Sequence, residues 1–139
     1  MSTYKYLSND EVRNQVAQSY YTATGDISEA DLGNDHNVAV DALTIGIPLI
    51  TSGNLGCTIF FRNTGADAAV KLVISPKATN KIIGSMTQAA AVFSASGVLD
   101  KDLENTKATA LKGDWVALRA VSLTEWYIIG GQGIWVSES

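Results

Sequence analysis

Apolar and polar positions follow two different periods along the chain. Near the N-terminus, Val12, Val16 and Tyr20 recur every four residues, which is the spacing of one face of an α-helix. The segment Ser8–Glu11 precedes this stripe and has the form of a capping box, in which the Ser and Glu side chains each bond the other residue's backbone amide. The pattern therefore predicts a short helix that ends near Tyr21.

The stripe of this predicted helix is narrow and has no apolar partner within the first 32 residues. We expect residues 1–32 to form an arm with a short helix, and residues 33–139 to form the main domain. The arm docks either on its own domain or on a neighbouring subunit. In the second case, its apolar residues contact the partner: Leu7, Val12, Val16 and Tyr20.

From His36 onward, short apolar or alternating runs are separated by Gly, Asn, Asp and Thr. This pattern is typical of an all-β sandwich or barrel. Residues 107–111 are one strand candidate. About eight other strands are expected, at residues 38–40, 43–50, 56–62, 69–75, 81–85, 90–95, 115–121 and 125–136, the last with a glycine kink.

Two local features suggest how the strands pair. Residues 57–62 and 70–74 are both rich in β-formers, and the turn-forming segment 63–68 lies between them, so we expect a hairpin. Pro48 interrupts the run at 43–50, which predicts an edge or bulged strand, because proline cannot donate to a β-ladder.

The alternation of apolar residues identifies a candidate core. In the run 115–121, Val116, Leu118 and Ala120 share one face, as expected for a half-buried strand. The same reasoning on the other runs gives the predicted core: Ile59, Phe61, Leu72, Ile74, Val116, Leu118, Trp126 and Ile128.

Charge and composition narrow the possible functions. The 139-residue chain is the size of one domain, and its net charge of −4 comes with no basic cluster, so we expect no nucleic-acid partner. No stretch approaches the roughly 18 apolar residues of a membrane span, and the N-terminus lacks the apolar region of a signal peptide, so we expect no membrane partner. Only 17% of the residues are charged, which is typical of an interaction surface.

The sequence offers little for catalysis. Cys57 lies in an apolar run and is expected to be a buried core thiol; the alternative, a small thiol enzyme, needs a nearby base. His36 is the only histidine, and its polar surroundings predict a solvated turn residue that cannot build a metal site alone. The glycines at 130, 131 and 133 follow a strand without the helix of a nucleotide-binding loop, so a bend or bulge between two strand pieces is expected. We predict no enzyme, no catalytic or metal-binding residue and no cofactor.

Three segments of the C-terminal 60 residues form an ordered set of motifs: Lys81–Ser85 with I-x-G, Leu111–Leu118 with K-G-D-x-V-x-L, and Glu125–Trp135 with W-x-I-x-G-x-x-G-x-W. In this order and spacing, the chain resembles the small β-sandwich domains of tailed-bacteriophage virion proteins. The resemblance implies a jelly-roll-like sandwich that assembles as a homotrimer, with no catalytic residues.

Proteins of this kind are either capsid decoration (cement) proteins or knobs of tail fibres and spikes. A short arm, rather than a long fibre-forming segment, precedes the expected sandwich, which favours a decoration protein. The resemblance then implies binding to the major capsid protein, stabilisation of capsomer contacts and a place on the virion exterior after synthesis in the host cytoplasm. The alternative is a tail knob or a receptor-binding, carbohydrate-binding module, with Trp126, Tyr127 or Trp135 exposed as a platform. Trp115 belongs to the same aromatic set, whose default role is core packing or interface anchoring.

Overall fold

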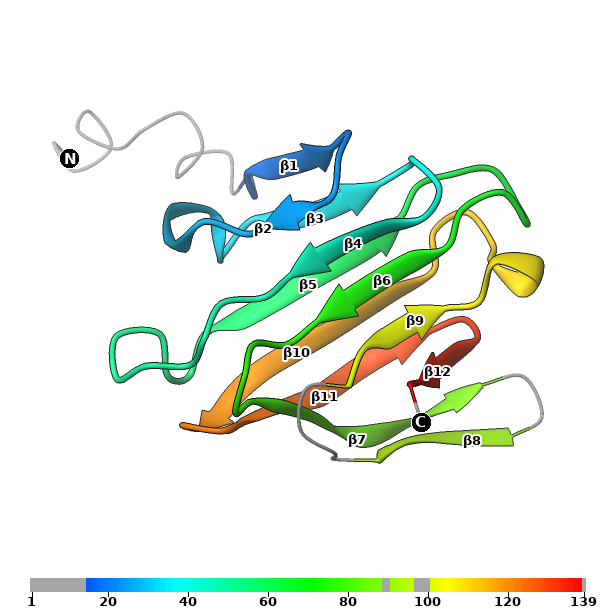
Figure 1. The fold of residues 1–139 in the computed structure, drawn as a ribbon. Coiled ribbons are helices and arrows are strands. Elements are labelled where there is room, and N and C mark those ends of the chain that lie inside the picture. Colours follow the sequence, from blue (N-terminus) through cyan, green and yellow to red (C-terminus); the bar gives the residue numbers. More distant parts are fainter. Residues whose placement is uncertain (1–14, 89–90, 97–100, 139) are drawn as a thin grey trace, which may run out of the picture.

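A computed structural model describes residues 15–88, 91–96 and 101–138 of the chain, with the backbone alone for 91–96. In these residues, twelve strands form two sheets that pack face to face (Figure 1). The chain is thus mostly β, as its alternating pattern predicts. None of the helices in this part of the chain is long and apolar enough to cross a membrane.

The larger sheet contains seven strands, in the order β1 (Gln18–Tyr21), β3 (Asp35–Val38), β5 (Thr58–Asn63), β10 (Trp115–Ser122), β11 (Glu125–Gln132), β7 (Lys81–Gln88) and β8 (Ala91–Ser96). The smaller sheet contains five, in the order β12 (Trp135–Ser137), β9 (Leu103–Asn105), β6 (Leu72–Ser75), β4 (Leu43–Gly46) and β2 (Gly25–Asp26). Two single-turn 3-10 helices, η2 (Glu29–Asp31) and η3 (Lys107–Thr109), lie in the connections.

The first half of the chain crosses repeatedly between the sheets. Strands β1, β3 and β5 belong to the larger sheet, and β2, β4 and β6 belong to the smaller one, so each connection is an arch over the core. Strands two apart in the sequence therefore become parallel neighbours: β1 with β3, β3 with β5, β2 with β4 and β4 with β6. The second half adds antiparallel pairs, including the hairpin of β10 and β11.

The core lies between the inner faces of the two sheets. All eight residues predicted for it are buried, as are Val38 and Ile45 from the first arches and Trp135 from the last strand. Two core residues, Ile27 and Leu32, come from the segment assigned to an arm. Residues 18–32 are therefore part of the sandwich.

Several predicted elements differ from the structure. The expected helix is wrong at its end, because Gln18–Tyr21 is strand β1; its predicted start at Ser8–Glu11 lies outside the described residues. The hairpin of residues 57–62 and 70–74 is wrong, because β5 pairs with β3 and β10 while β6 lies in the other sheet. The turn-forming segment 63–68 instead lies in an arch that leads from β5 in the larger sheet to β6 in the smaller sheet.

Two further predictions about strands are wrong. Strand β4 ends at Gly46, before Pro48, and lies between β2 and β6, so it is not an edge strand. Residues 107–109 form η3 rather than a strand. The glycine bend is confirmed: Gly133, with φ +110°, takes the chain from β11 in one sheet to β12 in the other.

His36 was predicted to be a solvated turn residue, and this is wrong. It lies in β3 with its side chain completely buried, and its ring packs against Tyr21 and Phe61. Its Nε2 lies 3.4 Å from the Leu32 carbonyl oxygen, which can only accept, so Nε2 carries the proton. Nδ1 then accepts a 2.6 Å hydrogen bond from the Tyr21 hydroxyl.

Candidate interaction surface on the seven-stranded sheet

The outer face of the larger sheet carries aromatic side chains. Residues on β5 alternate strictly between buried and partly exposed, so burial of Ile59 and Phe61 turns Phe60 outward. The register with β10 places Trp115 opposite Arg62, and the register with β11 places Arg119 opposite Tyr127. We call the surface formed by these five outward residues the aromatic face: Phe60, Arg62, Trp115, Arg119 and Tyr127.

Three members of the aromatic face form a stack. The rings of Phe60 and Trp115 lie 5.1 Å apart with an interplanar angle of 17°. The Arg62 guanidinium carbon lies 4.8 Å from the centre of the Phe60 ring, a cation–π contact, and Arg62 also pairs with Asp35 at 3.7 Å. These contacts hold large side chains in one arrangement before any partner binds, which lowers the entropic cost of binding.

A glycine lets the Trp115 ring extend over the neighbouring strand. A Cβ atom at Gly130 would lie only 3.1 Å from Cη2 of Trp115, so a larger residue there would push the indole away from the sheet. Arg119 is fixed on the same face by a 3.0 Å hydrogen bond from its Nε to the Thr58 hydroxyl. The aromatic face is thus an ordered surface.

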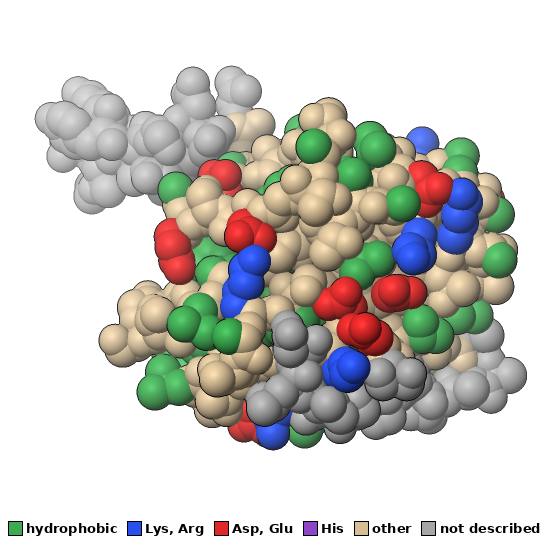
Figure 2. All heavy atoms as spheres, in the orientation of Figure 1, with side chains coloured by type: hydrophobic (Ala, Val, Ile, Leu, Met, Phe, Trp, Pro, Cys, Tyr) green, Lys and Arg blue, Asp and Glu red, His purple; other side chains and the backbone are tan. Residues whose placement is uncertain are grey.

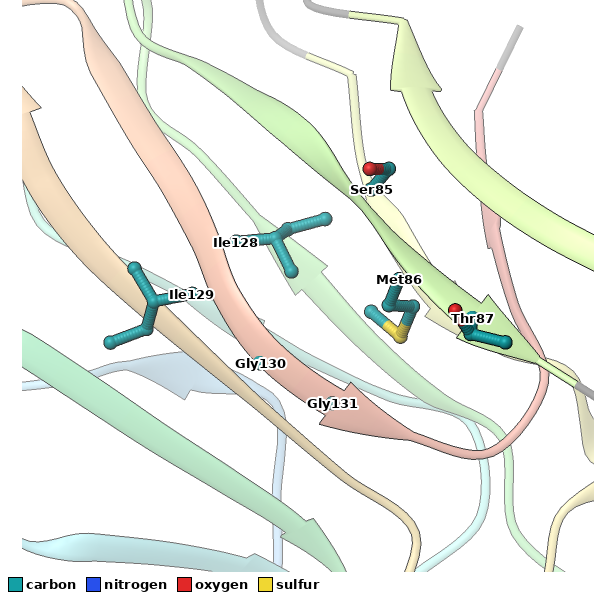
Figure 3. A pocket seen from close by; sticks show the side chains of 7 residues that line it. All are labelled: Ser85, Met86, Thr87, Ile128, Ile129, Gly130 and Gly131. Atoms are coloured by element: carbon teal, nitrogen blue, oxygen red, sulfur yellow. The ribbon is translucent and has the colours of Figure 1, made fainter.

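A hollow of about 440 Å³ lies next to the aromatic face, between β7 and β11 (Figure 3). The two strands pair in parallel only as far as Ile83 and Tyr127, and Gly84, with φ +129°, follows directly. Beyond this point, the Met86 side chain lies between the strands and beside Gly131, as Figure 3 shows. The hollow is lined by Ser85, Met86, Thr87, Ile128, Ile129, Gly130 and Gly131.

The smaller sheet presents a different surface. Figure 2 shows acidic and basic side chains spread over the face on its side of the molecule. Lys77 pairs with Asp26, and Lys107 pairs with Asp41, whose pKa is lowered mainly by the hydrogen bond from Lys107. Exposed charges are strongly hydrated, so this face is the weaker candidate for burial against a partner.

The predicted partner-facing residues are not brought together in the described part of the chain. Leu7 and Val12 lie outside the described residues. Val16 and Tyr20 are 56% and 75% exposed, next to and within the edge strand β1. Their role in binding a partner stays a prediction.

Two of the three tryptophans are core residues. Trp126 and Trp135 are completely buried, and the Trp135 indole donates a 3.0 Å hydrogen bond to the Gln132 carbonyl. Neither indole reaches the surface, so neither belongs to an exposed platform. Trp115 and Tyr127 are partly exposed on the aromatic face.

The titratable side chains with candidate chemistry are occupied by structural contacts. Cys57 is half-buried rather than fully buried, and burial, helped by the negative charge of Glu29, raises the pKa of its thiol. Burial lowers the pKa of His36, against opposing effects of the Leu32 carbonyl, Asp31 and Asp35. In the part of the chain that the structure describes, no group of three or more His, Cys, Asp or Glu residues could hold a metal ion.

No protein-family model matches the chain, and a search of curated proteins finds no significant match. The sequence motifs and the surfaces described above therefore carry the functional argument.

Proposed function

We propose that the chain is a structural virion protein of a tailed bacteriophage, namely a capsid decoration protein that binds the outer capsid surface. The resemblance of its C-terminal motifs to those of phage virion proteins motivates this proposal. The same resemblance is the basis for proposing a relation to jelly rolls, a homotrimeric state, and a place on the virion exterior after synthesis in the host cytoplasm. The parallel strand pairs of both sheets depart from the antiparallel pairing of a jelly roll. In this proposal the protein is not an enzyme, and its partners are other copies of itself and the major capsid protein.

The single observation that carries the binding role is the aromatic face. Trp, Tyr and Arg are the residues that most often dominate protein–protein binding energy, and here they lie together on one open sheet face. In a soluble sandwich the outer face of a sheet is expected to be polar. An outer face with stacked Phe60 and Trp115 is better explained by a partner surface that covers it in the assembled state.

The test is binding to capsids assembled from the major capsid protein of the virus that encodes the chain. Wild-type protein should co-sediment with these capsids and raise the temperature at which they break open. Trp115→Ala should weaken the binding at least tenfold, because it removes an anchor from the aromatic face. Val136→Ala is the matched control, since Val136 is an exposed apolar residue on β12 of the smaller sheet.

Two outcomes would overturn this proposal. One is a protein that neither binds these capsids nor changes their stability. The other is equal loss of binding in Trp115→Ala and Val136→Ala, because the aromatic face would then have no special role.

A tail knob or carbohydrate-binding module is the second candidate function. Aromatic rings stack on sugars, and the partly exposed rings of Phe60, Trp115 and Tyr127 on the aromatic face could form such a platform. The burial of Trp126 and Trp135 removes the larger platform expected from the sequence. Binding on a glycan array that is lost in Trp115→Ala would favour this candidate, and silence on the array would count against it.

A further inference from the structure

A second cavity, of about 420 Å³, lies where the turn between β11 and β12 meets the segment that leads into β10. Its volume is in the lower part of the range found for small-ligand pockets. Leu111 is exposed at the cavity, and Ile134 contributes a second apolar side chain. The full lining is Thr109, Leu111, Asp114, Gln132, Gly133 and Ile134.

Asp114 provides the only acidic group of this lining, and its side chain is almost completely buried. Its Oδ2 accepts two hydrogen bonds, from the Leu111 amide at 3.0 Å and from Asn105 Nδ2 at 3.1 Å. Asn105 in turn accepts a 2.7 Å bond from Asn63. This network of neutral groups orients the carboxylate but supplies no positive charge.

The other carboxylate oxygen, Oδ1, has no hydrogen-bond donor among the described residues. The ion pairs found in the same residues do not include Asp114 either. The carboxylate packs closely on Gly133, where a Cβ atom would lie 2.4 Å from its Cγ. Oδ1 is not among the fully buried oxygens that lack a partner, so it is open to the cavity, and a cation that enters can form a charge-assisted hydrogen bond with it.

We propose that this cavity binds the side chain of a lysine presented by a partner protein. The aliphatic stem lies against Leu111 and Ile134, and the ammonium group bonds Oδ1 of Asp114. Lysine fits better than arginine, because only one carboxylate oxygen is free, whereas a guanidinium pairs best with two. This inference rests on the proposed function, since the partner would be the capsid protein.

The first test uses small probes on the isolated protein, followed by NMR through the amide signals of Leu111 and Gly133. Nα-acetyl-lysine-N-methylamide should shift these signals in a saturable way. The Nε-acetylated form of the same probe, which lacks the charge, should bind at least tenfold more weakly. Equal shifts with both probes, or no saturable shift, would overturn the proposal. Equal or tighter binding of the corresponding arginine probe would overturn the assignment to lysine.

The second test removes the charge. Asp114→Asn should abolish binding of the lysine probe, whereas Asp67→Asn, a change at an exposed carboxylate that accepts from the Lys112 amide, should leave it unchanged. Fluorescence of the buried Trp126 and Trp135 reports whether each variant is folded. If Asp114→Asn does not fold, Leu111→Ser at the exposed rim is the replacement and should weaken probe binding at least threefold; unchanged binding would contradict the proposal.

The outcomes separate this inference from the proposed function. Capsid binding that depends on Trp115 but not on Asp114 would retain the decoration role and reject the lysine contact. Binding of the lysine probe by a protein that ignores capsids would retain the cavity and reject the decoration role.

Discussion

Leu118 and Ile129 are aliphatic residues on the paired strands β10 and β11, and their environments are opposite. Leu118 is completely buried between the sheets, whereas Ile129 is 45% exposed beside the hollow. Leu118→Ala should lower the free energy of unfolding by about 2–5 kcal/mol, through lost apolar burial and a residual cavity. Ile129→Ala should change it by less than about 0.5 kcal/mol. Urea denaturation of both variants measures the difference, and similar losses would contradict the assigned inner and outer faces.

His36 predicts a pH dependence of stability. Burial holds its folded-state pKa below the ordinary value of 6.5, so the unfolded chain binds a proton more readily than the folded protein. The contribution of His36 to stability is therefore complete above pH 6.5 and is lost as the pH falls toward the folded-state pKa. Denaturant unfolding between pH 8 and pH 5 should show this loss.

His36→Gln is the control for this prediction, because glutamine keeps a donor and an acceptor for Leu32 and Tyr21 but does not titrate in this range. The variant should be less stable at pH 8 and should show a flatter pH dependence. The same slope in wild type and variant would assign the loss to other groups.

At the scale of single residues, strand alternation predicts which side chains are buried, and it also predicts which side chains of the same strand point outward. Burial of Ile59 and Phe61 was predicted, and it already required Phe60 to point outward with Thr58 and Arg62. The stack of Phe60 on Trp115 was not predictable, because it depends on the pairing of β5 with β10. His36 was misassigned for a similar reason: Tyr21 and Phe61, which enclose it, are distant in sequence.

At the scale of elements, Gly133 and Gly113 illustrate two reasons why a position requires glycine: a positive φ angle and a lack of space for a side chain. Both have positive φ, +110° and +101°, which strains any other residue. A Cβ atom at Gly113 would meet nothing within 4 Å, whereas one at Gly133 would overlap the Asp114 carboxylate. Gly113→Ala should cost about 1–2 kcal/mol, the penalty of the left-handed backbone alone. Gly133→Ala should cost more, because the turn into β12 must also shift.

Thermal and urea unfolding of the two glycine variants measure these costs. Equal destabilisation would mean that the turn between β11 and β12 relaxes freely around the added methyl group. That result would also weaken the case for a rigid cavity beside Asp114.

Which strands pair with one another was the part of the fold that was hardest to predict from the sequence. Strands β10 and β11 form a hairpin, whose pairing depends on residues that are neighbours in the sequence. The segment between β5 and β6 has the same kind of turn chemistry but crosses to the other sheet, and local sequence does not distinguish a hairpin turn from an arch. Strand β9 has only three residues, too few for a recognisable period.

At the scale of the whole molecule, the two sheets present different outer surfaces, although both carry ion pairs. The pairs Lys77–Asp26 and Lys107–Asp41 lie by the smaller sheet, while the larger sheet combines the pairs Arg62–Asp35 and Lys81–Glu125 with the stack of Phe60, Trp115 and Arg62. Residues 18–32 supply strands to both sheets and Ile27 and Leu32 to the core. A chain that starts at Leu32 would lack β1 and β2, so a test of assembly must keep these residues.

The mass of the full chain in solution tests the proposed assembly. In the proposed trimer, three chains of 14.7 kDa give a mass of about 44 kDa in light scattering. If the aromatic face contacts the capsid, as we propose, Trp115→Ser should leave this mass unchanged while it weakens capsid binding. A trimer that dissociates in Trp115→Ser would instead make the aromatic face a contact between subunits. A monomer in both proteins would require that trimers form only on the capsid, where three weak contacts act together.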